Sequence, residues 1–126
     1  MLLNILAVGA GGFIGSSLRY MISLIKVNES FVFPIKTLSI NIIGCFVMGL
    51  IVAIALNNSN FDERLNLFLK VGICGGFTTF STFAAEFTDL YKSGNKWIAL
   101  AYAILTVCLS IAAVFSAKQI ANLIIK

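Results

Sequence analysis

The sequence contains no histidine and only one proline, and charged side chains make up only 11% of its 126 residues. Without an imidazole, a serine or cysteine nucleophile has no histidine base, which excludes Ser-His-Asp and Cys-His catalysis. Hydrophobic residues make up 60% of the chain, more than a soluble domain of this size needs to fill its core. The sequence therefore predicts an all-α integral membrane protein without histidine-based catalysis.

The basic residues do not predict a nucleic-acid partner. Nine Lys and Arg residues against five Asp and Glu residues give a net charge of +4. They are scattered at the edges of apolar runs instead of being gathered on one face. Such edges are where positive charge meets lipid headgroups. We therefore expect the partner of these residues to be a lipid bilayer.

Cysteine is also scarce, and its pattern does not indicate a redox or metal motif. Cys45, Cys74 and Cys108 lie inside apolar runs and form no CxxC motif. Three cysteines cannot all pair within one chain. We expect all three to act as buried small hydrophobic residues.

Four apolar runs are long enough to cross a bilayer, which requires about 20 residues for a helix. The spans are expected at about residues 2–25, 37–56, 66–91 and 97–117. Because they account for nearly the whole chain, we predict a single four-span transmembrane domain over residues 1–126. No basic segment precedes Leu2, so the first run is expected to be a spanning helix and not a cleaved signal peptide.

Small residues recur at four-residue spacing in the first span. Gly11 and Gly15 form a GxxxG motif, and Gly12 and Ser16 repeat the spacing one residue later. Small residues at this spacing allow the backbones of two membrane helices to approach closely. The pattern predicts a packing face for another helix.

The third span contains a helix-weakening segment in its middle. Gly75 and Gly76 are followed by a cluster of Thr, Phe and Ser in which the threonines are β-branched. In lipid every backbone N–H and C=O needs a partner, so a weakened helix is tolerated only inside protein or along a cavity. Helices broken near the bilayer midplane recur as ion sites. The pattern allows an ion site in a helix broken at its middle, or a flexible helix with a small-residue packing face.

Polar side chains lie on single faces of the second and fourth spans. Asn41 is the only amide in the second span. Burying an unsatisfied amide in hydrocarbon costs on the order of 4–8 kcal/mol, so Asn41 should face protein, water or an ion path. Tyr102, Thr106 and Ser110 stand at i, i+4 and i+8 and form a hydroxyl ladder. A helix-to-helix hydrogen bond for Asn41 and bonds within the helix for the hydroxyls are the alternatives.

The basic residues give the chain no preferred orientation. With the N-terminus in the cytoplasm, the cytoplasmic side carries Arg64, Lys70, Lys118 and Lys126, and the opposite side carries Arg19, Lys26, Lys36, Lys92 and Lys96. Four against five is no bias under the positive-inside rule, so the chain can insert both ways. Two copies in opposite orientations can pair about a twofold axis in the membrane plane. We therefore predict an antiparallel, dual-topology homodimer.

Three segments closely resemble the Fluc (CrcB) family of small fluoride channels. They are GGFIGSSLRY at residues 11–20, NIIGCFVMG at 41–49 and GGFTTFSTF at 75–83. The resemblance covers essentially the full length of the chain. It implies a fluoride-selective channel, expected to be bacterial and to span the plasma or inner membrane several times. Such a channel exports fluoride by electrodiffusion and so lowers the fluoride concentration inside the cell.

The resemblance also implies roles for individual residues. The backbone carbonyls of Gly75 and Thr78, from both chains, would hold one structural Na⁺ on the twofold axis of the dimer. Phe80 and Phe83 would line two pores with their ring edges, which carry the positive part of the ring quadrupole. Arg19 would raise the anion concentration in a vestibule. The other residues expected along the fluoride pathway are Asn41, Tyr102, Thr106, Ser110, Thr37, Ser81, Thr82 and Glu86.

Two other functions stay open. A small dual-topology multidrug transporter has a similar length and also lacks a charge bias, but that class exchanges protons for drugs through an acid in its first helix. Here the only charge in the first span is Arg19. A membrane scaffold without transport activity would leave the weakened third span and both polar faces unexplained.

Overall fold

The computed structural model describes residues 1–28 and 30–125, and every regular element within them is helical. The elements are α1 (Leu2–Ser23), α2 (Ile35–Asn57), α3 (Glu63–Asn66), the π-helix η1 (Leu67–Cys74), α4 (Gly75–Phe77), α5 (Phe80–Lys92) and α6 (Lys96–Ile124). Four stretches are long and apolar enough to cross a membrane: Leu2–Ser23, Ile35–Asn57, Glu63–Lys92 and Lys96–Ile124. The prediction of an all-α protein with four membrane-length helices is confirmed. We refer to Glu63–Lys92 as the third span.

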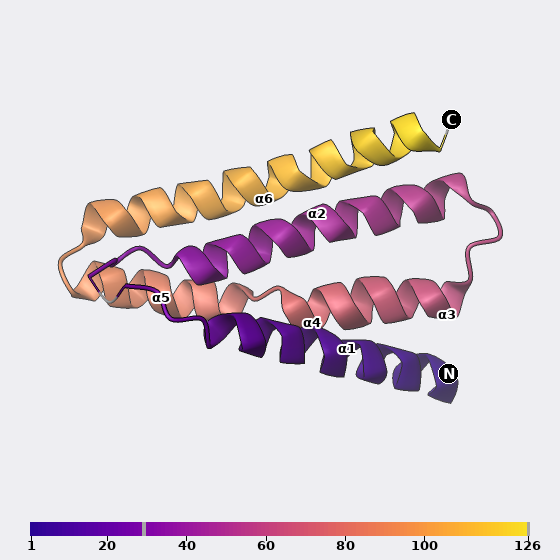
Figure 1. Cartoon of the computed structure of the whole chain (residues 1–126), viewed down its shortest axis with the longest axis horizontal. Coiled ribbons are helices and arrows are strands. Elements are labelled where there is room, and N and C mark those ends of the chain that lie inside the picture. Colours follow the sequence, from indigo (N-terminus) through magenta and orange to yellow (C-terminus); the bar gives the residue numbers. More distant parts are fainter. Residues whose placement is uncertain (29, 126) are drawn as a thin grey trace.

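The four spans lie side by side in an elongated bundle (Figure 1). α2 lies between α6 and the third span, and α1 packs against η1 and α4 on the other side of that span. Both chain termini lie at the end of the bundle where α2 leads into α3. The α1–α2 and α5–α6 connections lie at the opposite end. This arrangement separates the basic residues that the structure describes into the two groups that the charge count compared, and Lys126 lies outside the described residues.

Close contact between α1 and the third span depends on glycine. A Cβ atom added to Gly11 would collide with the Phe68 carbonyl oxygen and lie 2.9 Å from the Gly72 Cα atom. A Cβ atom added to Gly15 would collide with the Ile73 carbonyl oxygen. Backbone atoms therefore meet directly, as in other small-residue membrane interfaces. The close approach predicted from the GxxxG motif is confirmed.

A small hydrophobic core joins α2, α5 and α6 near the end of the bundle that holds the α5–α6 connection. Its buried members are Leu38, Phe83, Leu90, Ala99 and Tyr102. Phe33, in the connector between α1 and α2, packs against this cluster with its ring centroid 5.5 Å from that of Tyr102 in an edge-on arrangement. This packing fixes α5 against α6 and so positions the polar residues of both helices.

Thr78 and Thr79 lie outside the helices, between α4 and α5. Thr78 has ψ of 156°, and Thr79 has φ of −149° and ψ of 114°, so both have an extended backbone. The Thr79 side chain accepts the Thr82 N–H at 3.2 Å and caps α5 at its N-terminus. We call Thr78–Thr79 the interruption. The π-helical form of η1, which precedes α4, was not predicted because apolar spacing does not distinguish a π turn from an α turn.

The three free cysteines have different surroundings. Cys74 is buried, as expected. Cys45 is only half-buried and Cys108 is exposed on the surface of the chain, so the expectation of burial is wrong for these two. The reason is that an apolar helix presents residues in all directions, and membership of the run does not specify the face.

Candidate functional site

Asn41 of α2 binds the backbone of the interruption through both ends of its amide. Its Nδ2 donates to the Thr79 carbonyl oxygen at 3.1 Å, and its Oδ1 accepts the Thr79 N–H at 2.8 Å. Asn41 is 8% exposed and Thr79 is 9% exposed, so both bonds are shielded from solvent. An amide nitrogen carries two hydrogens, and one hydrogen bond leaves the second for another acceptor. Asn41 therefore stabilises the extended backbone of the interruption, and its second amide N–H can donate to another acceptor.

The Gly75 and Thr78 carbonyl groups are among those that lose their helical partners at the interruption. In a continuous α-helix the Thr79 N–H would bind the Gly75 carbonyl, and the Thr82 N–H would bind the Thr78 carbonyl. Here the Thr79 N–H is donated to Asn41, and the Thr82 N–H is donated to the Thr79 hydroxyl. The diverted bonds leave the Gly75 and Thr78 carbonyl oxygens without their α-helical donors. Carbonyl oxygens are the ligands that hard cations prefer.

Arg19 of α1 reaches the same region from the other side. Its Nε donates to the Gly76 carbonyl oxygen at 3.1 Å. Arg19 also lines a cleft of about 270 Å³ together with Tyr20, Ser23, Lys36, Thr37, Ile40, Thr79, Thr82 and Glu86. We call this the Arg19 cleft. A guanidinium has five N–H donors, so the bond to Gly76 leaves others for the cleft.

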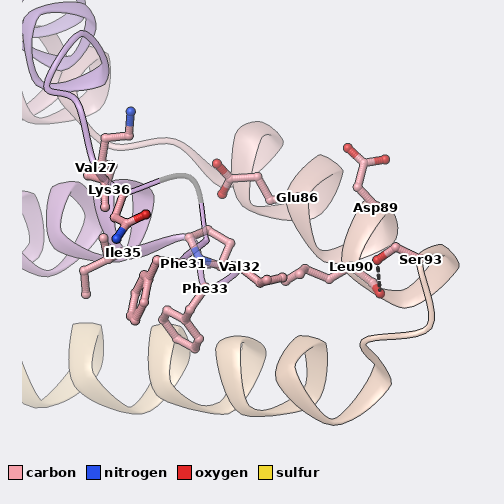
Figure 2. A pocket seen from close by; sticks show the side chains of 12 residues that line it. Val27, Phe31, Val32, Phe33, Ile35, Lys36, Glu86, Asp89, Leu90 and Ser93 are labelled. Carbon is pink, nitrogen blue, oxygen red and sulfur yellow. Dashed lines mark hydrogen bonds between the residues drawn. The ribbon is translucent and has the colours of Figure 1, made fainter.

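The Glu86 carboxylate is held by one hydroxyl from each of two other helices. Thr37 of α2 donates to Oε1 at 2.8 Å, and Tyr102 of α6 donates to Oε2 at 2.7 Å. Glu86 also lines a second cleft, of about 470 Å³, between α5 and the α1–α2 connector. Figure 2 shows this cleft, with Leu90 extending from α5 toward the connector residues. Glu86 therefore links α2, α5 and α6 at the edge of the Arg19 cleft.

A third cleft, of about 260 Å³, lies beside the interruption, between α2, α5 and α6. Its lining consists of Asn41, Cys45, Thr78, Thr79, Phe80, Phe83, Thr106, Val107, Ser110 and Ile111. We call this the interruption cleft. It brings together half of the residues that the sequence assigned to the fluoride pathway.

The hydroxyl groups of Thr106 and Ser110 are buried and have no hydrogen-bond partner among residues 1–28 and 30–125. Thr106 is 7% exposed. Bonds within the helix, the alternative considered for this ladder, are therefore not formed by these two hydroxyls. Nearly all buried polar groups in proteins are hydrogen-bonded, so each exception requires an explanation. Two unpartnered hydroxyls in one cleft indicate a place for a polar ligand.

Aromatic rings lead from the interruption cleft toward Glu86. The ring centroids of Phe80 and Phe83 are 5.5 Å apart, and those of Phe83 and Tyr102 are 5.1 Å apart. Phe83 and Tyr102 are buried, whereas Phe80 is 77% exposed. Tyr102 is the last of these three rings, and its hydroxyl donates to the Glu86 carboxylate.

The predicted pathway residues thus divide between two clefts. Asn41, Phe80, Phe83, Thr106 and Ser110 line the interruption cleft, and Arg19, Thr37, Thr82 and Glu86 line the Arg19 cleft. Ser81 is exposed, with its hydroxyl oxygen 3.4 Å from that of Thr79.

Thr79 was missed in the sequence although it lines both clefts. A threonine three residues before Thr82, at a helix start, is an N-cap pattern that could have identified it. Cys45, one helical turn after Asn41 on α2, was also missed as a lining residue.

Comparison with known proteins identifies relatives over nearly the whole chain. The family described as CrcB-like protein, Camphor Resistance (CrcB), matches residues 6–117. A protein of Azobacteroides pseudotrichonymphae genomovar. CFP2, named Fluoride-specific ion channel FluC, is 43% identical over 115 residues, covering 90% of this chain and 92% of the relative. A protein of the same name from Ruminiclostridium cellulolyticum is 41% identical over 125 residues, covering 98% and 95%. Another from Agrobacterium fabrum is 37% identical over 116 residues, covering 91% and 93%.

Proposed function

Because this chain belongs to the CrcB family, we propose that it is a fluoride-specific ion channel, as its relatives are named. The observation that carries the proposal is the interruption cleft, where the buried Thr106 and Ser110 hydroxyls have no partner. Passing an ion through such a cleft makes and breaks no covalent bond, so the protein is not an enzyme. The multidrug-transporter alternative has no support, since α1 contains no carboxylate.

Selectivity for fluoride follows from the donors in the cleft. Fluoride is small and strongly hydrated, so removing its water is prohibitive unless hydrogen-bond donors replace that water. The Thr106 and Ser110 hydroxyls and the remaining N–H of Asn41 can supply such donors. The positive edges of the Phe80 and Phe83 rings can attract the anion without a full charge that would trap it. A larger anion would not fit the same set of donors.

The anion would reach these donors from the Arg19 cleft. Arg19 and Lys36 both line that cleft, and their positive charge raises the local anion concentration. Thr79 lines both clefts, so the fluoride path would pass from the Arg19 cleft to the interruption cleft at this residue. The membrane potential, worth about 2.3 kcal/mol per charge per 100 mV, then drives fluoride out of the cell.

The channel is proposed to be an antiparallel homodimer in a bacterial plasma membrane. The balanced basic residues allow insertion in both orientations. Phe80 and Gly75, which are expected to line the pore and to hold an ion, are both exposed on the single chain. A second copy would cover both residues and complete the site. In the proposed dimer, the third span of each chain would be a membrane helix that is broken at its middle by the interruption.

A structural Na⁺ on the dimer axis is part of the same proposal. The Gly75 and Thr78 carbonyls fit this role because their α-helical donors are diverted. Gly75 and Thr78 of one chain supply two oxygens, so a cation that requires more ligands from these residues needs both chains. A bound cation would satisfy carbonyls that are otherwise costly in a membrane.

The deciding experiment is ion release from liposomes that contain the purified protein, measured with fluoride and chloride electrodes after a potassium ionophore is added. Wild-type protein should release fluoride quickly and chloride little. Thr106→Val keeps the side-chain shape but removes the hydroxyl, so fluoride release should slow about tenfold or more, as expected when one hydrogen bond to an ion is lost.

Thr88→Val is the matched control, because the Thr88 hydroxyl is exposed and donates only to the Ala85 carbonyl. Equal fluoride release by wild type and Thr106→Val would refute the role of the hydroxyl. If folded wild-type protein releases no fluoride, the channel proposal fails, and proton-coupled cation exchange becomes the next assay.

The orientation prediction can be tested in cells. A cysteine-reactive label applied to a C-terminal tag should reach about half of the molecules from outside, since neither orientation is favoured. Labelling of all molecules from one side only would rule out the antiparallel dimer.

A further inference from the structure

We propose that the Cys45 thiol makes the interruption cleft a binding site for soft monovalent metal ions such as Ag⁺, and that a bound ion stops fluoride flow. The blocking effect rests on the proposed channel function, whereas binding itself does not. Cys45 is a free cysteine, is half-buried and lines the cleft. It lies one helical turn from Asn41, on the face of α2 that meets the interruption.

A second feature of the cleft indicates room for a ligand. Thr106 lines the same cleft, and among the described residues its buried hydroxyl has no hydrogen-bond partner. The cleft volume of about 260 Å³ is several times the roughly 30 Å³ that one water molecule occupies in the liquid. Cys45 therefore borders a space that can hold an ion together with some of its water.

The chemistry of sulfur selects the ion. Thiolate is a soft ligand that prefers soft metal ions, whereas the carbonyl and hydroxyl oxygens around it are hard. When Ag⁺ binds, the Cys45 thiol releases its proton to water and a sulfur lone pair forms the S–Ag bond, with no electron transferred to or from the metal. Because fluoride is a hard anion, it does not draw the metal off the sulfur. The bound ion then occupies the space beside the donors that fluoride needs.

The other two cysteines provide controls within the chain. Cys74 is 1% exposed, so a metal ion cannot reach it without a change in the fold. Cys108 is exposed on α6 and, in the membrane, would face lipid or the partner chain. Neither thiol is in the lining of the interruption cleft.

The test uses liposomes in chloride-free buffer, with Ag⁺ added before fluoride release is started. Wild-type protein and Cys108→Ser should lose essentially all fluoride release when Ag⁺ is added. Cys45→Ser should release fluoride equally fast with and without Ag⁺, whatever rate that variant has by itself. Silver bound per chain is measured separately, by elemental mass spectrometry after gel filtration. The Cys74→Ala/Cys108→Ser variant should retain one silver ion, and adding Cys45→Ser should remove it.

The two measurements separate this proposal from the proposed function. No silver on the variant that keeps only Cys45 would overturn the site, and silver binding without loss of fluoride release would overturn the block. If untreated wild-type protein releases no fluoride, the channel function fails, and the silver count still decides whether Cys45 is a metal site.

Discussion

Replacing Asn41 by leucine is expected to abolish fluoride release and to destabilise the folded protein. Leucine has a similar size but cannot pair with the Thr79 N–H and carbonyl, which are bound by Asn41 at 2.8 and 3.1 Å. Each buried group left without a partner costs about 1–3 kcal/mol. The freed Thr79 N–H could return to the Gly75 carbonyl, which would close the helix across the interruption. Both the path and the carbonyl site would then be lost.

Thermal unfolding in detergent and ion release from liposomes measure the two effects. Asn57→Leu is the matched control, because Asn57 is exposed and its amide bonds only to Ala53 and Asn122 at the end of the bundle. Asn41→Asp tests the donor alone. It keeps an acceptor for the Thr79 N–H but, when ionised, sets an oxygen against the Thr79 carbonyl and adds a negative charge, so it should also release fluoride slowly. Normal release by Asn41→Leu would show that the bonds to Thr79 are not needed.

Replacing Gly15 by alanine is expected to destabilise the bundle, although alanine is normally the better helix residue. The added Cβ would collide with the Ile73 carbonyl oxygen, which belongs to the backbone and cannot rotate away. Overpacking of this kind costs typically about 1–3 kcal/mol, and more where backbone must move. Moving α1 would also pull Arg19, four residues later, away from the Gly76 carbonyl. We therefore expect lower thermal stability and slower fluoride release.

Gly12→Ala is the control on the same helix. A Cβ atom added to Gly12 has no neighbour within 4 Å. Without a collision, replacing glycine by alanine in a helix is worth roughly 0.5–1 kcal/mol in favour of alanine. The unfolding temperature of Gly12→Ala should therefore stay the same or rise. Equal unfolding temperatures for the two variants would contradict the direct backbone contact between α1 and the third span.

The fluoride-pathway residues show what a linear pattern can and cannot predict. The ladder of Tyr102, Thr106 and Ser110 was visible in the sequence because helical period is a local property. The hydrogen bonds of these hydroxyls could not be predicted from the sequence. Tyr102 donates to Glu86, whereas the Thr106 and Ser110 hydroxyls have no partner among the described residues. Whether a buried hydroxyl bonds to its own helix or faces a cleft depends on the neighbouring helices.

By itself the sequence determined the number of membrane-length helices, the glycine face of α1 and the resemblance to the family. These follow from run length, residue size and spacing, which do not depend on distant parts of the chain. Only the tertiary structure decided that Asn41 holds Thr79, 38 residues away, and that Thr37 holds Glu86, 49 residues away. Packing of α2 against the third span and α6 brings these groups together. In a membrane each must find a partner within the protein, and the choice among partners is made by the packed helices.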